Sequence, residues 1–196
     1  MSSIKYYDQN AQEFYDRTIN ADVSDLYQRF LSYMPTEGCI LDAGCGVGRD
    51  AKYFQSLGYD ARAFDASIEM VKKAALELRK DVWHMTFQHL DFINIFDAIW
   101  ANASLLHVPY TELKEVFQKL HSALKNEGIL FASFKYGNGL READNRLFSD
   151  MNEETILPYL EGLFLPLEIW KSSDTRSQKA ASPNKAWLNV ICRALK

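Results

Sequence analysis

The most informative residues of the chain are Gly44, Gly46 and Gly48, which lie in the segment ILDAGCGVGRD at residues 40–50. Because glycine has no Cβ atom, a loop of this kind lets a ligand approach the backbone closely. Asp65 follows 17 residues after Gly48 (65 minus 48), at the expected end of the next strand. A carboxylate there is suited to accept hydrogen bonds from both hydroxyls of a ribose. For the glycines alone, an ordinary tight turn is the alternative.

A third feature is the pair Asp91 and Phe92, which we expect at the end of a strand near residues 86–90. The carboxylate could accept from an exocyclic amine, and the ring could cover an aromatic base. Ligands of such folds bind at the carboxyl ends of parallel strands. The three features together therefore predict a nucleoside site, although chance placement is the alternative for any single aspartate.

The elements that must position these residues alternate between strands and helices. Short apolar runs predict strands at residues 39–43, 61–64, 86–90, 96–101 and 129–134. Between them, helical spacing predicts a helix over 49–57, one capped by Ser67 and one capped by Thr111. Alternation of this kind implies right-handed βαβ crossovers and a parallel sheet with helices on both faces.

The two ends of the chain have a different pattern. Helices are expected at residues 10–17 and after the potential cap Ser24, within an N-terminal segment 1–36. At the other end, a polar stretch and a helix near 153–160 precede two apolar strands, 164–171 and 186–194, joined by a loop over 172–185. These strands most simply form an antiparallel hairpin. No linker marks a second domain, so residues 1–196 are expected to fold as one.

Composition limits the class of protein. The 196 residues, 47% hydrophobic and 24% charged, are typical of a globular chain and exclude disorder and fibrous repeats. A net charge of −4 gives no general attraction to nucleic acid or anionic lipid. Cys39, Cys45 and Cys192 include no CxxC pair, which indicates neither a disulfide framework nor a metal site. The polar start and the lack of a membrane-length apolar stretch predict a cytoplasmic protein without a membrane partner.

At the glycine loop and the expected strand ends, the sequence resembles the class I S-adenosylmethionine-dependent methyltransferases. The resemblance is carried by DAGCGVG, FDAS, LDF and FDAIWANASLLHVP, and it covers about residues 36–136. The last of these segments also resembles small bacterial methyltransferases, including relatives of the tellurite-resistance enzymes. The GxGxG spacing of Gly44, Gly46 and Gly48 differs from the GxGxxG of nicotinamide dehydrogenases. This difference disfavours a dehydrogenase as the alternative. The resemblance implies a Rossmann-like, seven-stranded, mostly parallel sheet with a C-terminal antiparallel hairpin.

The resemblance also implies S-adenosyl-L-methionine as cofactor and assigns residues to it. The loop glycines would surround the methionyl part, and Asp42 would lie behind the loop or contact the amino group. Asp65 would bind the ribose, and Ala66 and Met70 would line the adenine pocket. The implied cofactor-binding residues are Asp42, Ala43, Gly44, Gly46, Gly48, Asp65, Ala66, Met70, Asp91, Phe92 and Asn102.

Methyl transfer from a sulfonium needs little acid or base help, because alignment of donor and acceptor can supply most of the rate. Asn102, His107 and Tyr7 are the candidate catalytic residues. His107 could take a proton from the acceptor, or it could only hydrogen-bond loop backbone. Tyr7 could face the sulfonium from an N-terminal lid, or its ring could simply dock the helix.

The sequence therefore favours a methyltransferase that acts on a small molecule, as a monomer or a homodimer. A nucleic-acid partner is disfavoured because the Pro-Pro-aromatic signature of amide-nitrogen methyltransferases is replaced by NASL after the fourth strand. Two alternatives stay open: a macromolecular acceptor, and a module that binds the cofactor without turnover.

Overall fold

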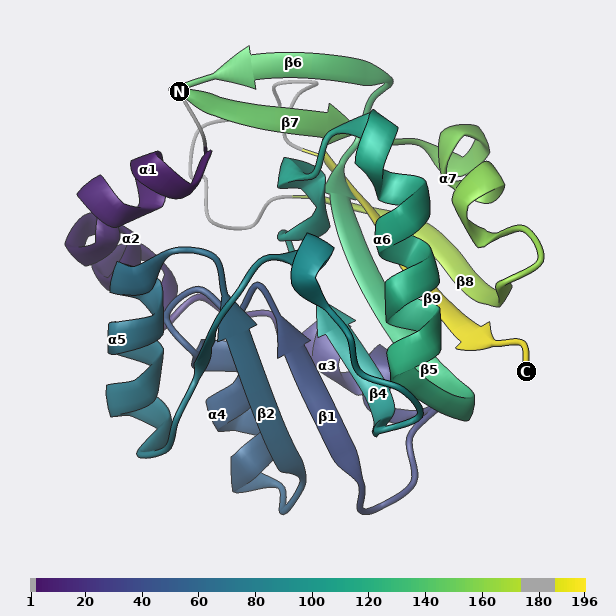
Figure 1. The fold of residues 1–196 in the computed structure, drawn as a ribbon, viewed down its shortest axis with the longest axis horizontal. Coiled ribbons are helices and arrows are strands. Elements are labelled where there is room, and N and C mark those ends of the chain that lie inside the picture. The colour runs from purple at the N-terminus through teal and green to yellow at the C-terminus, as the bar shows by residue number, and fades with distance from the viewer. Residues whose placement is uncertain (1–2, 174–185) are drawn as a thin grey trace.

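The computed structural model describes residues 3–173 and 186–196 of the chain. Within these ranges, seven strands form one sheet in the order β3-β2-β1-β4-β5-β9-β8 (Figure 1). Their bounds are β1 (Cys39–Ala43), β2 (Asp60–Asp65), β3 (Trp83–His84), β4 (Phe96–Ala101), β5 (Leu124–Lys135), β8 (Phe164–Ser173) and β9 (Ala186–Ala194). The five neighbouring strands β3, β2, β1, β4 and β5 are parallel to one another, whereas β9 is antiparallel to both β5 and β8. The predicted fold class is confirmed.

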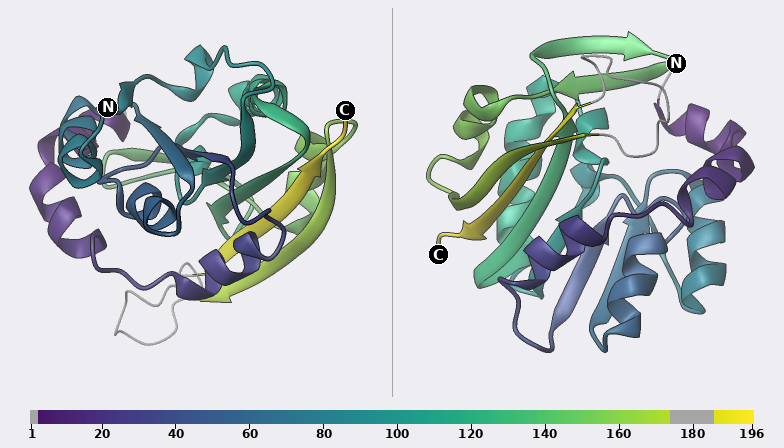
Figure 2. Two further views of the ribbon diagram at one scale, coloured as in Figure 1. Left: turned by 90° about the horizontal axis from the view of Figure 1, so that it is seen from below. Right: turned by 180° about the vertical axis from the view of Figure 1, so that it is seen from behind.

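Helices cover both faces of this sheet (Figures 1 and 2). One face carries α3 (Ser24–Leu31), α4 (Arg49–Ser56) and α5 (Ile68–Leu78), and the other carries α6 (Tyr110–Ala123) and α7 (Glu153–Leu160). Helix α6 shows why: Leu113, Val116, Phe117 and Leu120 recur on one side and are almost fully buried. An apolar stripe at helical spacing must face the sheet.

The carboxyl ends of the parallel strands are covered by elements from the two outer thirds of the chain. Helices α1 (Ser3–Gln9) and α2 (Ala11–Thr18) lie there beside a small hairpin, β6 (Gly139–Ala143) and β7 (Arg146–Asp150) (Figure 1). The backbone N–H of Leu147 donates to Ser3 Oγ over 3.0 Å. The guanidinium of Arg146 lies 4.4 Å from the centre of the Tyr6 ring. These contacts join the N-terminal helix to the hairpin.

The strand predicted over residues 86–90 is wrong. The third strand ends at His84 because it pairs with only Phe64 and Asp65 of β2. The chain then turns into the 3-10 helix η1 (Phe87–His89). Phe87 in η1 packs edge-on against Phe64, with ring centres 5.1 Å apart. The apolar residues in this segment therefore reflect burial of a short turn.

The hairpin of β6 and β7 was not predicted, because its exposed face makes its sequence polar. Asp144 and Asn145 form its two-residue turn with φ values of 51° and 59°. Ser67 caps α5 as predicted, since its hydroxyl accepts from Met70 N at 3.2 Å. Ser24 and Thr111 do not cap their helices, which begin one residue or more before the expected position. Most of the predicted 172–185 loop lies outside the described residues, and its first two residues belong to β8.

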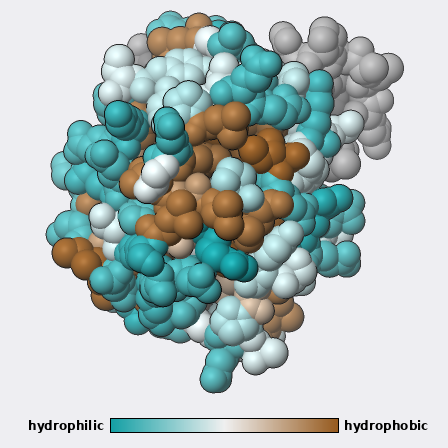
Figure 3. Space-filling model, turned by 90° about the vertical axis from the view of Figure 1, so that its right-hand side faces the viewer, coloured by the Kyte–Doolittle hydropathy of each residue, from teal (hydrophilic) through white to brown (hydrophobic). Residues whose placement is uncertain are grey.

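The face that carries β8, α7 and the C-terminus shows apolar side chains among polar ones (Figure 3). Leu157, Leu165 and Leu195 are about half exposed on these elements. Figure 3 shows that the apolar side chains gather in the middle of this face, with polar ones around them. Among the described helices, none is long and apolar enough to cross a membrane.

Gly48 provides a test of the packing between α4 and α5. Its φ is +84°, and an added Cβ would lie 3.0 Å from the Cα and Cβ atoms of Ala74. Gly58 is the matched control, because its φ is +94° but nothing lies within 4 Å of an added Cβ. We expect Gly58→Ala to lower the free energy of unfolding by about 1 to 2 kcal/mol from backbone strain. Gly48→Ala should lose roughly 1 kcal/mol or more beyond that.

Urea denaturation of both variants measures the difference. Equal decreases in the free energy of unfolding at the two positions would show that α4 and α5 can move apart to fit the added Cβ without destabilising the fold.

Candidate functional site

A cavity of about 770 Å³ opens at the carboxyl ends of β1, β2 and β4. Small-molecule sites occupy roughly 300 to 1,000 Å³, so the cavity has the size of such a site. Its walls come from the loops after these strands, from α1 and α2, from the β6–β7 hairpin and from β5, β8 and β9. The fold therefore brings the predicted glycine loop to this cavity.

The glycine loop forms one wall of the cavity through Gly44, Cys45, Gly46 and Val47. The backbone N–H groups of Gly44 and Cys45 donate to the carbonyl of Phe64 at 3.0 and 2.9 Å, which ties the loop to the end of β2. Gly44 has a φ of +73°, and an added Cβ would lie 2.5 Å from the Cβ of Ser104. No other residue fits there without movement of the loop after β4.

Two residues predicted at this wall lie elsewhere. Gly48 does not line the cavity, because its missing side chain makes room for Ala74 of α5. Ala43 is fully buried at the end of β1, and its carbonyl accepts a 2.6 Å hydrogen bond from Ser104 Oγ. Both residues lie behind the loop and not at the cavity surface.

Asp65 lines the cavity and also holds the loop in place. Its Oδ2 accepts from Gly46 N and its Oδ1 accepts from Ser67 N, each over 2.8 Å. Burial raises the pKa of Asp65 to about 6, against the effect of these backbone donors. A carboxylate has about four lone-pair sites, so each oxygen can still accept one further hydrogen bond. The side chain therefore fits a vicinal diol.

The wall next to Asp65 is formed by Ala66, Ser67 and Met70 and by residues 86–88 after β3. Asp91 and Phe92, predicted to lie here, do not line the cavity. Asp91 is exposed, and the Phe92 ring packs 5.0 Å from Trp83 and 5.3 Å from Phe96. The prediction was wrong because β3 ends earlier than its apolar pattern indicated. Thr86 and Phe87 occupy the expected position.

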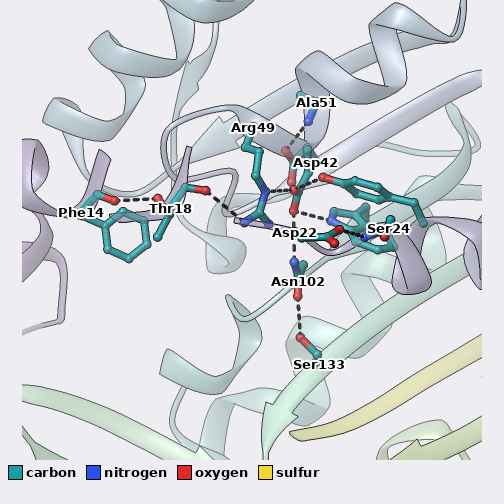
Figure 4. A network of polar contacts seen from close by, with 12 residues as sticks. Phe14, Thr18, Asp22, Ser24, Asp42, Arg49, Ala51, Asn102 and Ser133 are labelled. Atoms are coloured by element: carbon teal, nitrogen blue, oxygen red, sulfur yellow. Dashed lines mark hydrogen bonds and ion pairs between the residues drawn. The ribbon is translucent and has the colours of Figure 1, made fainter. Parts of the chain in front are cut away.

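Behind the loop, two buried aspartates, Asp42 and Asp50, fix the start of α4. Figure 4 shows Asp42 beside Ala51. Asp42 accepts from Ala51 N at 2.9 Å and does not line the cavity, in agreement with its expected place behind the loop. Burial raises the pKa of Asp42 well above its usual range. For Asp50 burial acts in the same direction, but the charge and hydrogen bond of Arg49 lower its pKa overall. The pKa shifts of the two carboxyls therefore have opposite directions, and the surroundings stabilise the ionised form of Asp50.

Four side chains donate to the Asp50 carboxylate. The donors are Tyr27 Oη at 2.5 Å, Arg49 Nε at 2.5 Å, Trp100 Nε1 at 2.8 Å and Asn102 Nδ2 at 3.2 Å. Arg49 also reaches the carbonyl of Thr18 in α2 over 3.3 Å, as Figure 4 shows. Arg49 and Asp50, which are adjacent at the start of α4, form an ion pair. The other three donors come from distant parts of the chain.

Asn102 lines the cavity in a fixed orientation. While its nitrogen donates to Asp50, its Oδ1 accepts from Ser133 Oγ at 3.0 Å (Figure 4). Ser133 Oγ in turn accepts from Ala103 N at 2.7 Å. The network thus runs from α4 through the end of β4 to β5.

The candidates Tyr7 and His107 meet at the cavity, although 100 residues separate them. The Tyr7 hydroxyl lies 2.8 Å from His107 Nε2, and His107 Nδ1 lies 2.7 Å from the carbonyl of Leu147. Because a carbonyl only accepts, Nδ1 carries the proton and Nε2 accepts from Tyr7. Burial lowers the pKa of His107 to about 4 and raises that of Tyr7. His107 is therefore a weak base, and the backbone group that it contacts belongs to β7 and not to a loop.

Comparisons with known proteins agree with this geometry. A family model described as a methyltransferase domain matches residues 15–158. The malonyl-[acyl-carrier protein] O-methyltransferase of Salmonella typhimurium is 28% identical over 136 residues, which are 63% of this chain and 53% of the relative. The chain thus spans about half the length of that relative.

Two solved structures share the fold. One is the 1,6-didemethyltoxoflavin-N1-methyltransferase of Burkholderia thailandensis, with bound 1,6-didemethyltoxoflavin and S-adenosylhomocysteine. It has a TM-score of 0.78 and 20% identity, over 98% of this chain and 85% of that chain. The other is a TehB-like S-adenosylmethionine-dependent methyltransferase of Corynebacterium glutamicum. It has a TM-score of 0.72 and 17% identity, over 97% of this chain and all of that chain (100%).

Nitrogen-detected NMR tests the protonation state of His107. We expect the ring to stay neutral, with the proton on Nδ1, until the pH approaches about 4. Tyr7→Phe removes the donor to Nε2 and should raise the pKa of His107, since it removes a hydrogen bond to the neutral form. A titration of the wild-type ring near its usual pKa of about 6.5 would contradict the buried arrangement.

The Asp50 network can be tested through stability. Tyr27→Phe leaves a buried carboxylate short of one donor, so we expect the free energy of unfolding to fall by about 1 to 3 kcal/mol. Tyr33→Phe is the matched control, because the Tyr33 hydroxyl donates over 2.8 Å to Glu168, a carboxylate in a less buried setting. Urea denaturation compares the two, and a larger loss at Tyr33 would count against the network.

Proposed function

Because the chain belongs to the class I S-adenosylmethionine-dependent methyltransferases, we propose that it transfers a methyl group to a small-molecule acceptor. S-adenosylmethionine is the cofactor of this family, and when bound it supplies an activated methyl group on a sulfonium. A cavity with the volume of a small-ligand site supports the small-molecule acceptor. So does its cover of α1 and the β6–β7 hairpin, which would obstruct a macromolecular chain.

The cavity residues fit the cofactor. Asp65 has free lone pairs for the ribose hydroxyls, and Ala66, Met70 and Phe87 provide an apolar surface for the adenine. Gly44 and Gly46 expose backbone where the methionyl part would lie, beside Asn102. We assign the cofactor to these residues, and we assign support of the loop to Asp42, Ala43 and Gly48.

The chain's contribution to chemistry is mainly positioning. His107 is a poor general base, since its pKa lies at about 4 and its Nε2 already accepts from Tyr7. Tyr7 and Phe14 of the N-terminal helices line the cavity, so we propose that residues 1–36 act as a lid on a single domain of 196 residues. A closed site would hold acceptor and cofactor in line and keep water out.

The observation that carries this proposal is Asp65 between the loop and the cavity, and calorimetry with S-adenosylhomocysteine tests it. Each hydrogen bond to a charged group contributes roughly 1.5 to 3 kcal/mol, so Asp65→Ala should weaken binding by at least about tenfold. Asp60→Ala, at the exposed opposite end of β2, should leave binding unchanged. Equal affinities for wild type and Asp65→Ala would refute the assignment.

The raised pKa of Asp65 adds a pH dependence. Hydroxyl donors prefer the ionised carboxylate, so affinity should be full above about pH 7, be halved at about pH 6 and be about tenfold lower at pH 5. Asp65→Asn should remove this dependence, because it has no ionisable group. Release of S-adenosylhomocysteine in the presence of acceptors then separates a transferase from a module that only binds.

A further inference from the structure

The cavity extends past the residues assigned to the cofactor, to the antiparallel part of the sheet. Ser133 of β5, Asn189 of β9 and Ser172 of β8 line it there. Ser133 and Asn189 are direct partners in the β5–β9 ladder, so their side chains share one face. Since the cofactor residues come from β1, β2 and the loops after β3 and β4, this end is left for the acceptor. The inference drawn from it rests on the proposed function.

Asn189 is the residue at this end with unused hydrogen-bonding capacity. Its Nδ2 donates to Ser172 Oγ at 2.9 Å and to the carbonyl of Trp170 at 3.4 Å. Because that carbonyl only accepts, the nitrogen must face it and the amide cannot be reversed. Asn189 is 1% exposed, and its Oδ1 has no hydrogen-bond partner among the residues that the structure describes. Nearly all buried polar groups are paired, so a ligand that donates to this oxygen would supply the hydrogen bond that it lacks.

The charge of the cavity limits which donor this can be. The acidic residues along the described walls are Asp22, Asp25, Asp50, Asp65, Glu112 and Glu142. Arg49 is the single Lys or Arg among the described lining residues, and its charge is paired with Asp50. Such walls oppose an anionic acceptor, such as a carboxylate or a phosphate, and accommodate a neutral one or one that becomes positive.

The weak base in the cavity limits the acceptor further. A hydroxyl becomes a good nucleophile only when a base removes its proton, and His107 is engaged by Tyr7 and Leu147. A neutral nitrogen can react through its lone pair and lose its proton afterwards. A nitrogen acceptor therefore matches both the walls and the lack of a strong base.

We propose that the acceptor is a neutral molecule with a nitrogen that bears hydrogen, and that Asn189 Oδ1 accepts a hydrogen bond from this N–H group. The nitrogen lone pair forms the new nitrogen–carbon bond as the carbon–sulfur bond breaks, and the sulfur leaves as a neutral thioether. The positive charge passes to the nitrogen, which then releases its proton to water. The N–H bond to Asn189 strengthens as this charge develops, which favours the transition state.

Matched fragments on the wild-type protein test the acceptor class: aniline, N,N-dimethylaniline, phenol and benzoate. With S-adenosylhomocysteine bound, ligand-observed NMR should detect aniline in the cavity and show weaker binding of N,N-dimethylaniline and benzoate, which have no donor for Asn189 Oδ1. Phenol has a donor, so the rate of methylation separates it from aniline. With S-adenosylmethionine, aniline should be methylated at least about tenfold faster than phenol or benzoate, by mass spectrometry of the products. Methylation confined to phenol or benzoate, or no binding of aniline, would overturn the acceptor class. Failure of S-adenosylhomocysteine itself to bind would instead refute the proposed function.

Asn189→Leu tests the residue. Loss of the hydrogen bond at about 1.4 kcal/mol should raise the KM for aniline about tenfold, while the Kd for S-adenosylhomocysteine stays within about twofold. Asn126→Leu makes the same change at an exposed position, at the opposite end of β5 from Ser133, and should alter neither value. An unchanged KM in Asn189→Leu would show that the amide does not contact the acceptor. If this variant fails to fold, the fragment results on the wild type still decide the acceptor class.

Discussion

The buried carboxylate of Asp50 sets the arrangement of the cavity wall. Removing a carboxylate from water is costly unless it is paired and fully hydrogen-bonded. Asp50 receives donors from α3, α4 and β4 and from the residue directly after β4, so these parts must lie in one mutual position. Asn102 is held by Asp50 on one side and by Ser133 on the other. The charge that stabilises the start of α4 therefore also orients a residue of the cavity.

Much of the wall around the glycine loop could be predicted because its signals are local. The strand before Gly44, the glycines themselves and Asp65 lie within about thirty residues, and the spacing of the two features depends on one βαβ unit. The prediction that Asp91 and Phe92 lie at the cavity failed for an equally local reason. The edge strand β3 has only two residues, which is too short for a periodic pattern in the sequence. The short hairpin at residues 139–150 was missed although Asp144 and Asn145 are residues that favour a two-residue turn.

The rest of the site depends on contacts that no local pattern encodes. Tyr7 and His107 were each candidates, but their hydrogen bond depends on how α1 settles against the β6–β7 hairpin. The pKa of His107 falls because this contact buries the ring, so its chemistry is a product of tertiary structure. Asn189 had no sequence signal, since an asparagine in an apolar strand looks like an exposed position. Only the structure shows that its Nδ2 is hydrogen-bonded to Trp170 and Ser172 of β8, whereas its Oδ1 has no partner among the described residues.

The two ends of the cavity use their polar groups in opposite ways. Near β1 and β2, Asp42 and Ser104 bond to backbone of their own chain, and Asp65 does so with both oxygens. A wall held in this way keeps its shape before a ligand arrives, which reduces the entropy lost on binding. At β9 the Oδ1 of Asn189 is unpaired among the described residues, and in the proposed complex the acceptor would complete its hydrogen bonding. A site that binds the same cofactor in every reaction gains from rigidity. Selection among methyl acceptors depends instead on polar groups that stay without a hydrogen bond unless the right molecule binds. The parallel half of the sheet thus suits the common part of the reaction, and its antiparallel extension suits the part that distinguishes this chain from others with the same fold.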